Sequence, residues 1–119
     1  NYSESDIIHT YLRGHESCPS RVECLYGLVN YCRLNGLNHI GYIFGKQGIM
    51  VKKPTTALFL EDWTYDYGIL DEFSIVAYYS GNYQESKDIC EKLLNENKIP
   101  THYTDRVKSN LQFAINMIS

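Results

Sequence analysis

The sequence is poor in the features that mark several protein classes. It has 3 prolines and 8 glycines in 119 residues, which are too few for a flexible linker or a collagen-like chain. It has no apolar run approaching the roughly 18 residues that cross a bilayer. It also has no basic excess, since 11 Lys and Arg face 14 Asp and Glu for a net charge of −3. We therefore expect neither a membrane nor a nucleic acid as its partner.

The composition is that of a small folded domain. Apolar residues make up 44% of the chain and charged residues 21%, which is too apolar for a disordered segment. A chain of 119 residues can bury one core but not two, so we predict a single domain over residues 1–119. The first residue is Asn1, and the polar start does not resemble a secretory signal. We therefore interpret the chain as a segment of a longer protein.

The 4 cysteines show no pattern of reactive or metal-binding chemistry. Cys24 and Cys32 are about 12 Å apart along one helix, which is too far for a disulfide. His15, Cys18 and Cys24 lack a fourth zinc ligand at a suitable spacing, and no flanking motif makes Cys32 with His39 a nucleophile pair. We expect free thiols in a reducing, cytoplasmic compartment, with no metal, no cofactor and no catalytic residue.

Helical spacing of apolar residues runs through nearly the whole chain, and the alternation typical of strands is missing. The pattern predicts an all-α fold of about six helices joined by short turns, which favour antiparallel neighbours. The predicted helices start at Ser3 and end at Gly14, start at Pro19 and end at Asn35-Gly36, and cover about 37–50, 65–80, 83–97 and 104–117. Between them, residues 51–63 form a long connector that packs Leu58, Phe59 and Trp63 onto the core.

Two local signals refine these helices. Ser3 and Asp6 resemble a capping box at the first helix. The third predicted helix contains Gly41, Gly45 and Gly48, and each glycine costs about 1 kcal/mol relative to alanine inside a helix. We expect that another helix backbone approaches closely on that side.

Two stretches follow the same order of residue sizes. Residues 25–54 and 70–100 each run from large apolar residues through a turn glycine and a small residue to a proline, which is the order of tetratricopeptide (TPR) repeats. The turn glycines Gly36 and Gly81 are 45 positions apart against about 34 in that repeat, and the connector accounts for the surplus. We expect antiparallel helix pairs in a short right-handed solenoid, with Gly41 facing Leu28 of the preceding helix.

Three segments carry a closer resemblance: residues 19–26 (PSRVECLY), 59–72 (FLEDWTYDYGILDE) and 77–86 (AYYSGNYQES). Over about residues 5–115 the chain resembles the TPR-like region that follows the catalytic domain in some family 2 glycosyltransferases of bacteria and giant viruses. It departs from the repeat at Gly45 and Gly48, where a larger residue and alanine are usual. The resemblance implies a parent protein that transfers sugar from a nucleotide sugar. The Asp-x-Asp motif of that chemistry is absent from this sequence, so we expect this chain itself not to be an enzyme.

An acidic set surrounds the fourth predicted helix. It comprises Glu61, Asp62, Asp66, Asp71 and Glu72. The irregular spacing does not match a calcium loop, whereas acidic residues at a helix start favour the helix dipole. We therefore expect these carboxylates at the helix start and on the surface.

The candidate binding residues come from the repeat register. In stacked helix pairs, the first helix of each pair lines one continuous face. Counting away from the core positions places there Glu23, Tyr26, Asn30 and Arg33 from one pair and Asp71, Ile75, Tyr78 and Tyr79 from the other. A mixed polar and aromatic groove suits peptide or protein recognition, although the same residues also fit an ordinary solvated face.

We therefore expect a non-catalytic interaction module of a glycosyltransferase-like protein. It would bind a protein or peptide partner or the parent's catalytic domain, position an acceptor, or join subunits into a homo-oligomer. The alternative is a freestanding helical scaffold unrelated to sugar transfer. An Asp-x-Asp motif in the parent sequence would favour the first interpretation.

Overall fold

The computed structural model describes residues 3–17, 22–52 and 63–118. These ranges contain six α-helices and no strand, which confirms the predicted all-helical class. The α-helices are α1 (Glu4–Ser17), α2 (Glu23–Leu34), α3 (Asn38–Ile49), α4 (Ile69–Tyr79), α5 (Tyr83–Glu96) and α6 (Thr104–Ile118). A π-helical turn over Thr64–Gly68 leads into α4, and a 3-10 turn over Thr101–Tyr103 leads into α6.

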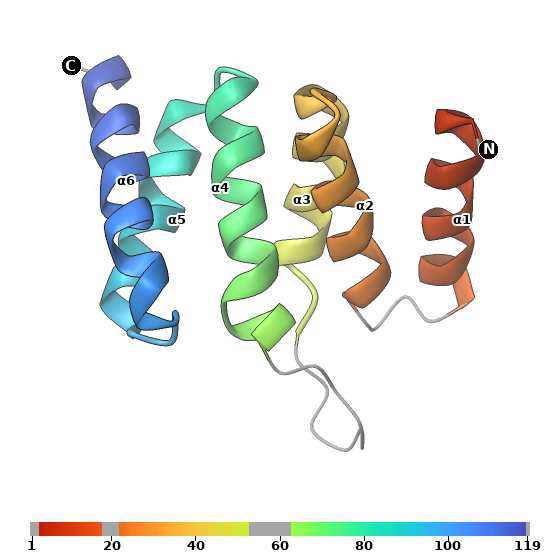
Figure 1. Cartoon of the computed structure of the whole chain (residues 1–119), viewed down its shortest axis with the longest axis horizontal. Coiled ribbons are helices and arrows are strands. Elements are labelled where there is room, and N and C mark those ends of the chain that lie inside the picture. The colour runs from red at the N-terminus through yellow and green to blue at the C-terminus, as the bar shows by residue number, and fades with distance from the viewer. Residues whose placement is uncertain (1–2, 18–21, 53–62, 119) are drawn as a thin grey trace.

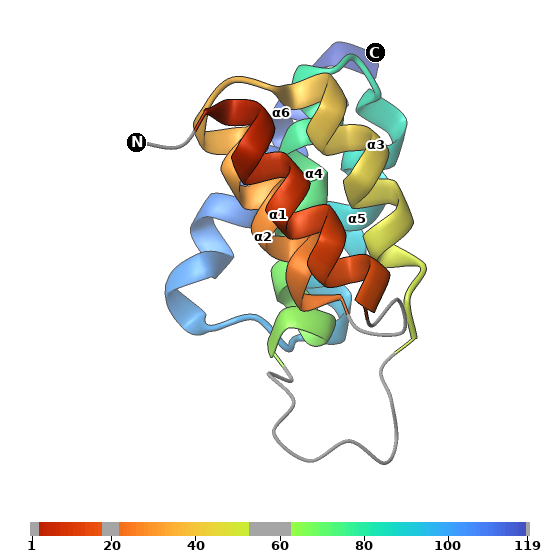
Figure 2. The same ribbon diagram turned by 90° about the vertical axis from the view of Figure 1, so that its right-hand side faces the viewer.

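The helices stand side by side in two layers around α4. Figure 1 shows α2, α4 and α6 along one side of the molecule, with α3 and α5 behind them. Figure 2, turned by 90°, separates α3 and α5 from α2 and α6. Each helix contacts the next one along the chain from α1 to α6, and both α2 and α6 also contact α4. As a result, α4 presents one side to α3 and α5 and the other to the space between α2 and α6.

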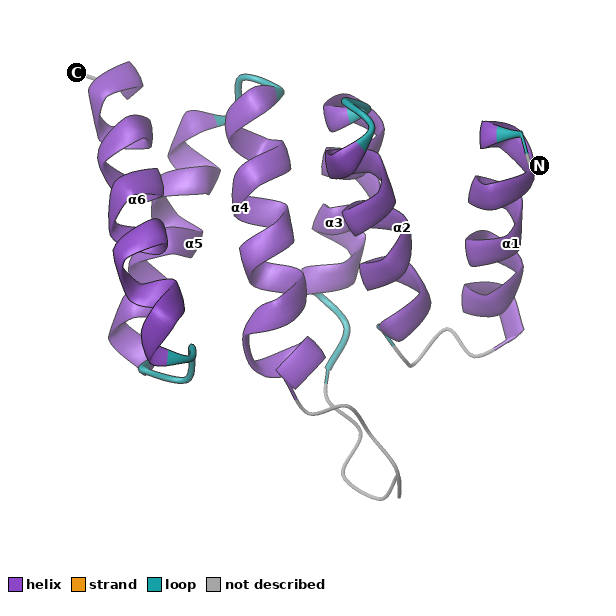
Figure 3. Ribbon diagram, in the orientation of Figure 1, coloured by secondary structure: helices purple, strands orange, loops and turns teal. Residues whose placement is uncertain are grey.

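The turns after α2 and α4 are built in the same way. In Figure 3 they are the short loops at the top of the α2–α3 and α4–α5 pairs. Gly36 has φ +75° and Gly81 has φ +88°, which is the left-handed conformation that glycine adopts without strain. In each turn the N–H three residues beyond the helix end donates to a carbonyl in the last turn, from Leu37 to Cys32 and from Asn82 to Ala77, both at 2.8 Å. This is the Schellman motif, and it repeats at the two positions that the sequence aligns.

The glycines of α3 lie where α3 packs against α4. A Cβ on Gly45 would lie 2.9 Å from Cδ1 of Phe73, and one on Gly48 would lie 3.0 Å from Cδ1 of Ile69. The predicted close approach of a second helix is therefore confirmed. Gly41 faces the preceding helix as predicted, since a Cβ there would lie 3.1 Å from Cβ of Cys32 on α2, but its nearest atoms belong to Val76 of α4 and to Cys32 and not to Leu28. We call this α3–α4 contact the glycine seam, defined by Gly41, Gly45 and Gly48.

The core is continuous from α2 to α6. Its largest fully buried side chains are Phe73, Leu25, Leu28 and Leu93. The small-residue position of the second aligned stretch is Ser86, which is buried on α5. Its hydroxyl donates to the backbone carbonyl of Ser74 on α4 at 2.8 Å, so α5 also approaches α4 through a small side chain. Cys24, Cys32 and Cys90 are free thiols.

The N-terminal helix agrees with the sequence at its start and differs at its end. The capping box is confirmed, because the N–H of Asp6 donates to the Ser3 hydroxyl at 3.1 Å and the N–H of Ser3 donates to the Asp6 carboxylate at 3.3 Å. The predicted end at Gly14 is wrong, since α1 continues to Ser17. Gly14 packs against Sγ of Cys24 on α2, so this glycine serves a helix contact and not a helix stop.

Some predicted features fall in segments 18–21 and 53–62, outside the described residues. These are the start of the second helix at Pro19, the fourth cysteine Cys18, and Leu58 and Phe59 of the connector. Among the helices of the described residues, none has the length and apolar character needed to span a bilayer.

Candidate functional site

Three hollows follow α4 on the side that lies between α2 and α6. The first, of about 330 Å³, is lined by Tyr26, Asn30, Arg33, Trp63, Tyr67, Gly68, Asp71, Glu72, Tyr103 and Arg106. The second, of about 470 Å³, is lined by Arg33, Asn38, Ile75, Tyr79, Arg106 and Asn110. The third, of about 60 Å³, is lined by Ser74, Ile75, Tyr78, Tyr79, Ser86, Asn110 and Phe113. Because neighbouring hollows share wall residues, we treat them together as the α4 groove.

The α4 groove brings together seven of the eight residues expected from the sequence. Tyr26, Asn30, Arg33 and Asp71 line the first hollow. Ile75 and Tyr79 line the second and third, and Tyr78 lines the third. Glu23 lines none of these hollows. Its carboxylate instead accepts a hydrogen bond from the Tyr65 hydroxyl at 3.4 Å, next to the N–H of Val22, which donates to the same hydroxyl at 3.1 Å.

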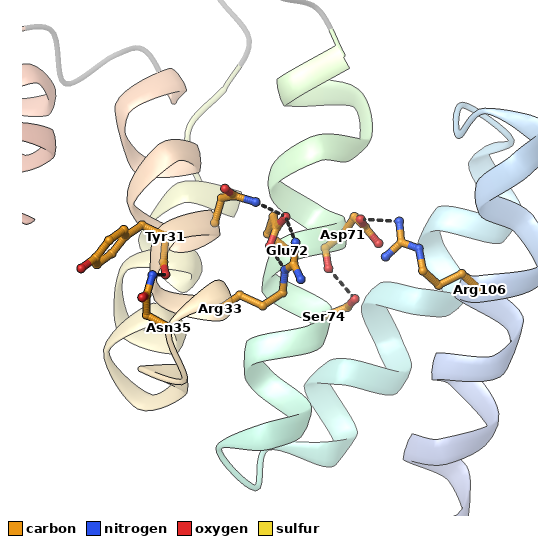
Figure 4. Close-up of polar contacts among 8 residues, drawn as sticks. Tyr31, Arg33, Asn35, Asp71, Glu72, Ser74 and Arg106 are labelled. Atoms are coloured by element: carbon orange, nitrogen blue, oxygen red, sulfur yellow. Dashed lines mark hydrogen bonds and ion pairs between the residues drawn. The ribbon is translucent and has the colours of Figure 1, made fainter. Parts of the chain in front are cut away.

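Glu72 anchors the α2 side of the groove. Only 4% of this residue is exposed. Its carboxylate accepts hydrogen bonds from Arg33, with Nη2 at 3.1 Å and Nε as a second donor, and from Nδ2 of Asn30 at 2.9 Å. Figure 4 shows Arg33 reaching Glu72 from α2. The hydrogen bond to Glu72 raises the pKa of the Arg33 guanidinium. The Glu72 carboxylate is so deeply buried that it requires such hydrogen-bond partners. Its two hydrogen bonds with Arg33 in turn fix the rotamer of that arginine.

Asp71 anchors the α6 side in the same way. Nη2 of Arg106 donates to its Oδ2 at 2.9 Å, and Figure 4 shows the two side chains meeting between α4 and α6. The Arg106 guanidinium also lies 4.6 Å from the centre of the Tyr103 ring, which is a cation–π distance. Burial raises the pKa of the Asp71 carboxyl, and the hydrogen bond from Arg106 opposes that rise. The other oxygen, Oδ1, is buried and accepts no hydrogen bond within the described residues.

The prediction that the acidic set lies at the surface is therefore wrong for Asp71 and Glu72. The helical backbone continues into α4 from the π-helical turn, so these carboxylates are not at a free helix end. Arginines from α2 and α6 balance their charges. Asp66 does lie nearer the surface, 3.8 Å from Nζ of Lys98, whereas Glu61 and Asp62 lie outside the described residues.

Aromatic rings form the wall of the first hollow at the start of α4. The rings of Tyr26 and Trp63 meet edge to face at 5.0 Å between centroids, and those of Tyr67 and Tyr103 do so at 5.5 Å. Trp63 is 38% exposed, so only part of its ring packs inward as predicted. It covers Gly68, where a Cβ would lie 2.7 Å from the indole. These paired rings form rigid apolar walls of the first hollow. The ion pairs Arg33–Glu72 and Arg106–Asp71 form its charged base, which we call the floor of the groove.

Several groove residues are missing from the sequence prediction although a signal for them exists. Arg106, Asn110 and Phe113 lie on α6, each one position before a core residue of the pattern Val107, Leu111 and Ala114. Extending the repeat register to the sixth helix would place them in the groove. For Glu72 the signal is weaker, since it consists only of two adjacent charges inside the most apolar helix of the chain.

Within the described residues, no group of three or more His, Cys, Asp or Glu side chains is arranged to hold a metal ion. Cys90 on α5 is buried, and desolvation raises its pKa to about 11. It is therefore a neutral thiol at pH 7 and a poor nucleophile.

No family model, no curated protein and no solved structure matches this chain.

Proposed function

We propose that the chain is a TPR-like helical-repeat module that binds a peptide segment of a partner protein in the α4 groove. The observation that carries this proposal is the pair of ion pairs on its floor, Arg33 with Glu72 and Arg106 with Asp71. They hold two guanidinium groups in place from opposite sides of α4. The arginine side chains remain 31% and 43% exposed, so they keep donors for a ligand.

The arrangement of the helices supports the solenoid part of the proposal. In a solenoid of helix pairs, α2 with α3 and α4 with α5 would form two units, and α6 would begin a third. The first helices of the units would then share one side, as α2, α4 and α6 do in Figure 1. The Schellman turns at Gly36 and Gly81 and the small residues Gly41 and Ser86 fall at equivalent positions of the two units.

The walls of the groove fit an extended peptide. Tyr79 is 67% exposed and Phe113 is 54% exposed, and both line the third hollow, where an apolar side chain would be buried against them. The guanidinium groups are already ordered by their carboxylates, so binding costs less side-chain entropy than it would with free arginines. The polar donors along the floor can bind the polar backbone of a peptide. The apolar walls on both sides can contact its side chains.

We further propose that the parent protein is glycosyltransferase-like and that this module positions an acceptor or joins subunits without taking part in catalysis. The support is the resemblance carried by residues 19–26, 59–72 and 77–86. A freestanding interaction scaffold is the competing assignment. A nucleotide-sugar transferase domain with an Asp-x-Asp motif elsewhere in the parent sequence would favour the first, and its absence from the complete parent would favour the second.

The groove assignment is tested by selecting peptides and then blocking the groove. The full chain is used to select binders from a phage library of random peptides, and the affinity of the selected peptides is measured by calorimetry. Ile75→Arg places a third cation between Arg33 and Arg106 and fills the second hollow, so binding should fall at least tenfold. Ile43→Arg is the matched control, because Ile43 is 51% exposed on α3, in the other layer, and it should leave binding unchanged. Selected peptides that bind Ile75→Arg as tightly as the parent chain would contradict the proposal.

A further inference from the structure

Asp71, which lines the first hollow, has one carboxylate oxygen that the described residues leave without a partner. Oδ1 of Asp71 accepts no hydrogen bond within the described residues, while Oδ2 accepts one from Arg106. The Asp71 side chain is 9% exposed, and the residue lines the hollow. A buried acceptor without a donor raises the free energy of the folded chain, and a ligand that supplies a donor recovers that loss.

The surrounding charges restrict the kind of donor. Arg33 and Arg106 flank the hollow, and they balance the charges of Asp71 and Glu72. An ammonium group would meet two guanidinium groups, which repel it. An anion would find Arg33 and Arg106 already paired and two carboxylates beside them. A divalent cation needs several oxygen ligands, and the described residues hold no such set. A neutral N–H therefore fits best.

The aromatic walls restrict the group next to that donor. The ring pairs of Tyr26 with Trp63 and Tyr67 with Tyr103 border the same hollow. Aromatic rings pack favourably edge to face or offset against one another, and a flat ring of a ligand would add to this wall. An amide N–H one or two carbons from such a ring could reach the floor.

We propose that the first hollow takes an aromatic residue of a bound peptide together with a neighbouring neutral amide, whose N–H donates to Asp71. This inference rests on the proposed peptide-binding function and makes Asp71 its specificity-determining residue. Oδ1 itself is covered, so the donor reaches it when the carboxylate rotates about χ2, which is a soft torsion in aspartate. Arg106 is 43% exposed and can follow Oδ2 as it turns.

Three small probes with one aromatic skeleton test the donor. They are 3-phenylpropionamide, methyl 3-phenylpropionate and 3-phenylpropionate, which present a neutral N–H, a neutral acceptor and an anion. Chemical-shift titrations with the full chain at pH 7 measure the three affinities. The amide should bind at least fivefold more tightly than either of the others, with shifts at Tyr26, Asp71 and Tyr103.

Asp71→Asn tests the residue. The asparagine oxygen can keep the hydrogen bond from Arg106 and turn its NH₂ group towards the hollow, replacing an acceptor by a donor. The preference for the amide over the anion should then disappear or reverse. Asp88→Asn is the matched control, because Asp88 is exposed on α5, and it should keep the preference. Melting curves of both variants establish that they are folded.

The outcomes separate this inference from the function on which it rests. Equal binding of amide and ester, tightest binding of the anion, or an unchanged preference in Asp71→Asn would overturn the inference. If selected peptides still depend on Ile75 in any of these cases, the proposed function stands without it. If neither peptides nor probes bind the folded chain, both fail.

Discussion

The two sides of α4 bury different kinds of side chain against their neighbouring helices. Towards α3, Phe73, Val76 and Ile69 pack against the glycine seam, with no room for even one added carbon at Gly45. Towards α2 and α6, the same helix buries Asp71 and Glu72 and leaves hollows of about 330 and 470 Å³. One side is apolar and tightly packed, whereas the other is charged, hydrogen-bonded and open.

This difference suggests that the side of α4 facing α3 stabilises the fold, whereas the side facing α2 and α6 serves the proposed recognition. Apolar burial and close packing stabilise a fold in proportion to the contacts made. Buried ion pairs contribute little net stability, because desolvation offsets most of their attraction. The carboxylates of α4 therefore hold two arginines in position at a small net effect on the fold. Substitutions on the seam should lower stability more than substitutions on the groove side.

The largest effect is expected from Gly45→Leu. A Cβ at this position already lies 2.9 Å from Phe73, and leucine adds three further carbons. Overpacking typically costs about 1–3 kcal/mol and sometimes more, and about 1 kcal/mol returns as helix propensity. Because the contact is so tight, we expect an overpacking cost of about 4 kcal/mol and therefore a net loss of about 3 kcal/mol, measured as the shift of the urea midpoint.

The control for the seam is Gln47→Leu, an exposed position on the same helix, which should change stability by less than about 0.5 kcal/mol. Phe73→Ala makes room opposite Gly45, so adding Gly45→Leu in that background should cost much less. Equal costs in both backgrounds would mean that Gly45 does not pack on Phe73.

Ser86→Leu should have the next largest effect. Ser86 is 1% exposed and donates a hydrogen bond to the carbonyl of Ser74. Leucine removes that donor and adds volume between α4 and α5, for an expected loss of about 2 kcal/mol in the free energy of unfolding. Asn95→Leu, at an exposed position of α5, is the control. A chain with Ser86→Leu that matches the parent in urea would refute the equivalence of Ser86 with Gly41.

The tightly packed side was predictable from the sequence, and the polar side only in part. Gly41, Gly45 and Ser86 stand out because small residues at helical spacing follow from neighbouring contacts and turns. Glu72 and Asp71 look like surface residues, since their partners Arg33 and Arg106 are 39 and 35 positions away. Only the assembled layers bring α2, α4 and α6 together, so the repeat register located most of the groove but not the ion pairs on its floor.

Glu72→Gln should cost less than Gly45→Leu or Ser86→Leu. The amide keeps the shape of the side chain but gives weaker hydrogen bonds to Arg33 and Asn30, and hydrogen bonds to charged groups are worth about 1.5–3 kcal/mol. Since 31% of the Arg33 side chain reaches solvent, water compensates part of this, and we expect a loss of about 1 kcal/mol. Glu91→Gln, which removes the charge from the partly exposed pair with Lys87, is the control. A loss for Glu72→Gln above that of Ser86→Leu would reverse the proposed ranking of the two sides.

The smallest expected effect is a pH dependence of stability that originates at Asp71. The titratable or charged groups that act on this carboxyl or are affected by it are Glu72 on α4, Tyr26 and Arg33 on α2, Cys90 on α5, Tyr67 and Arg106. Burial is the largest single influence on the pKa of Asp71 and raises it, whereas the hydrogen bond and the charge of Arg106 lower it, and the net shift of the pKa is upward. The pKa of Asp71 is therefore higher in the folded chain than in the unfolded one.

The sign of the effect follows from proton binding. Between the ordinary aspartate pKa of about 3.9 and the raised folded value, the folded chain holds a proton on Asp71 that the unfolded chain has lost. The contribution of Asp71 to stability therefore rises as pH falls from 7 through that window. Asparagine does not ionise, so Asp71→Asn lacks this contribution. Urea unfolding from pH 7 to 4 should show the stability of the parent chain growing relative to that of Asp71→Asn, whereas Asp88→Asn should show no such trend. A relative stability that falls towards pH 4 would mean that Arg106 lowers the pKa of Asp71 by more than burial raises it. The ion pair of Asp71 with Arg106 would then be stronger than we infer from the groove.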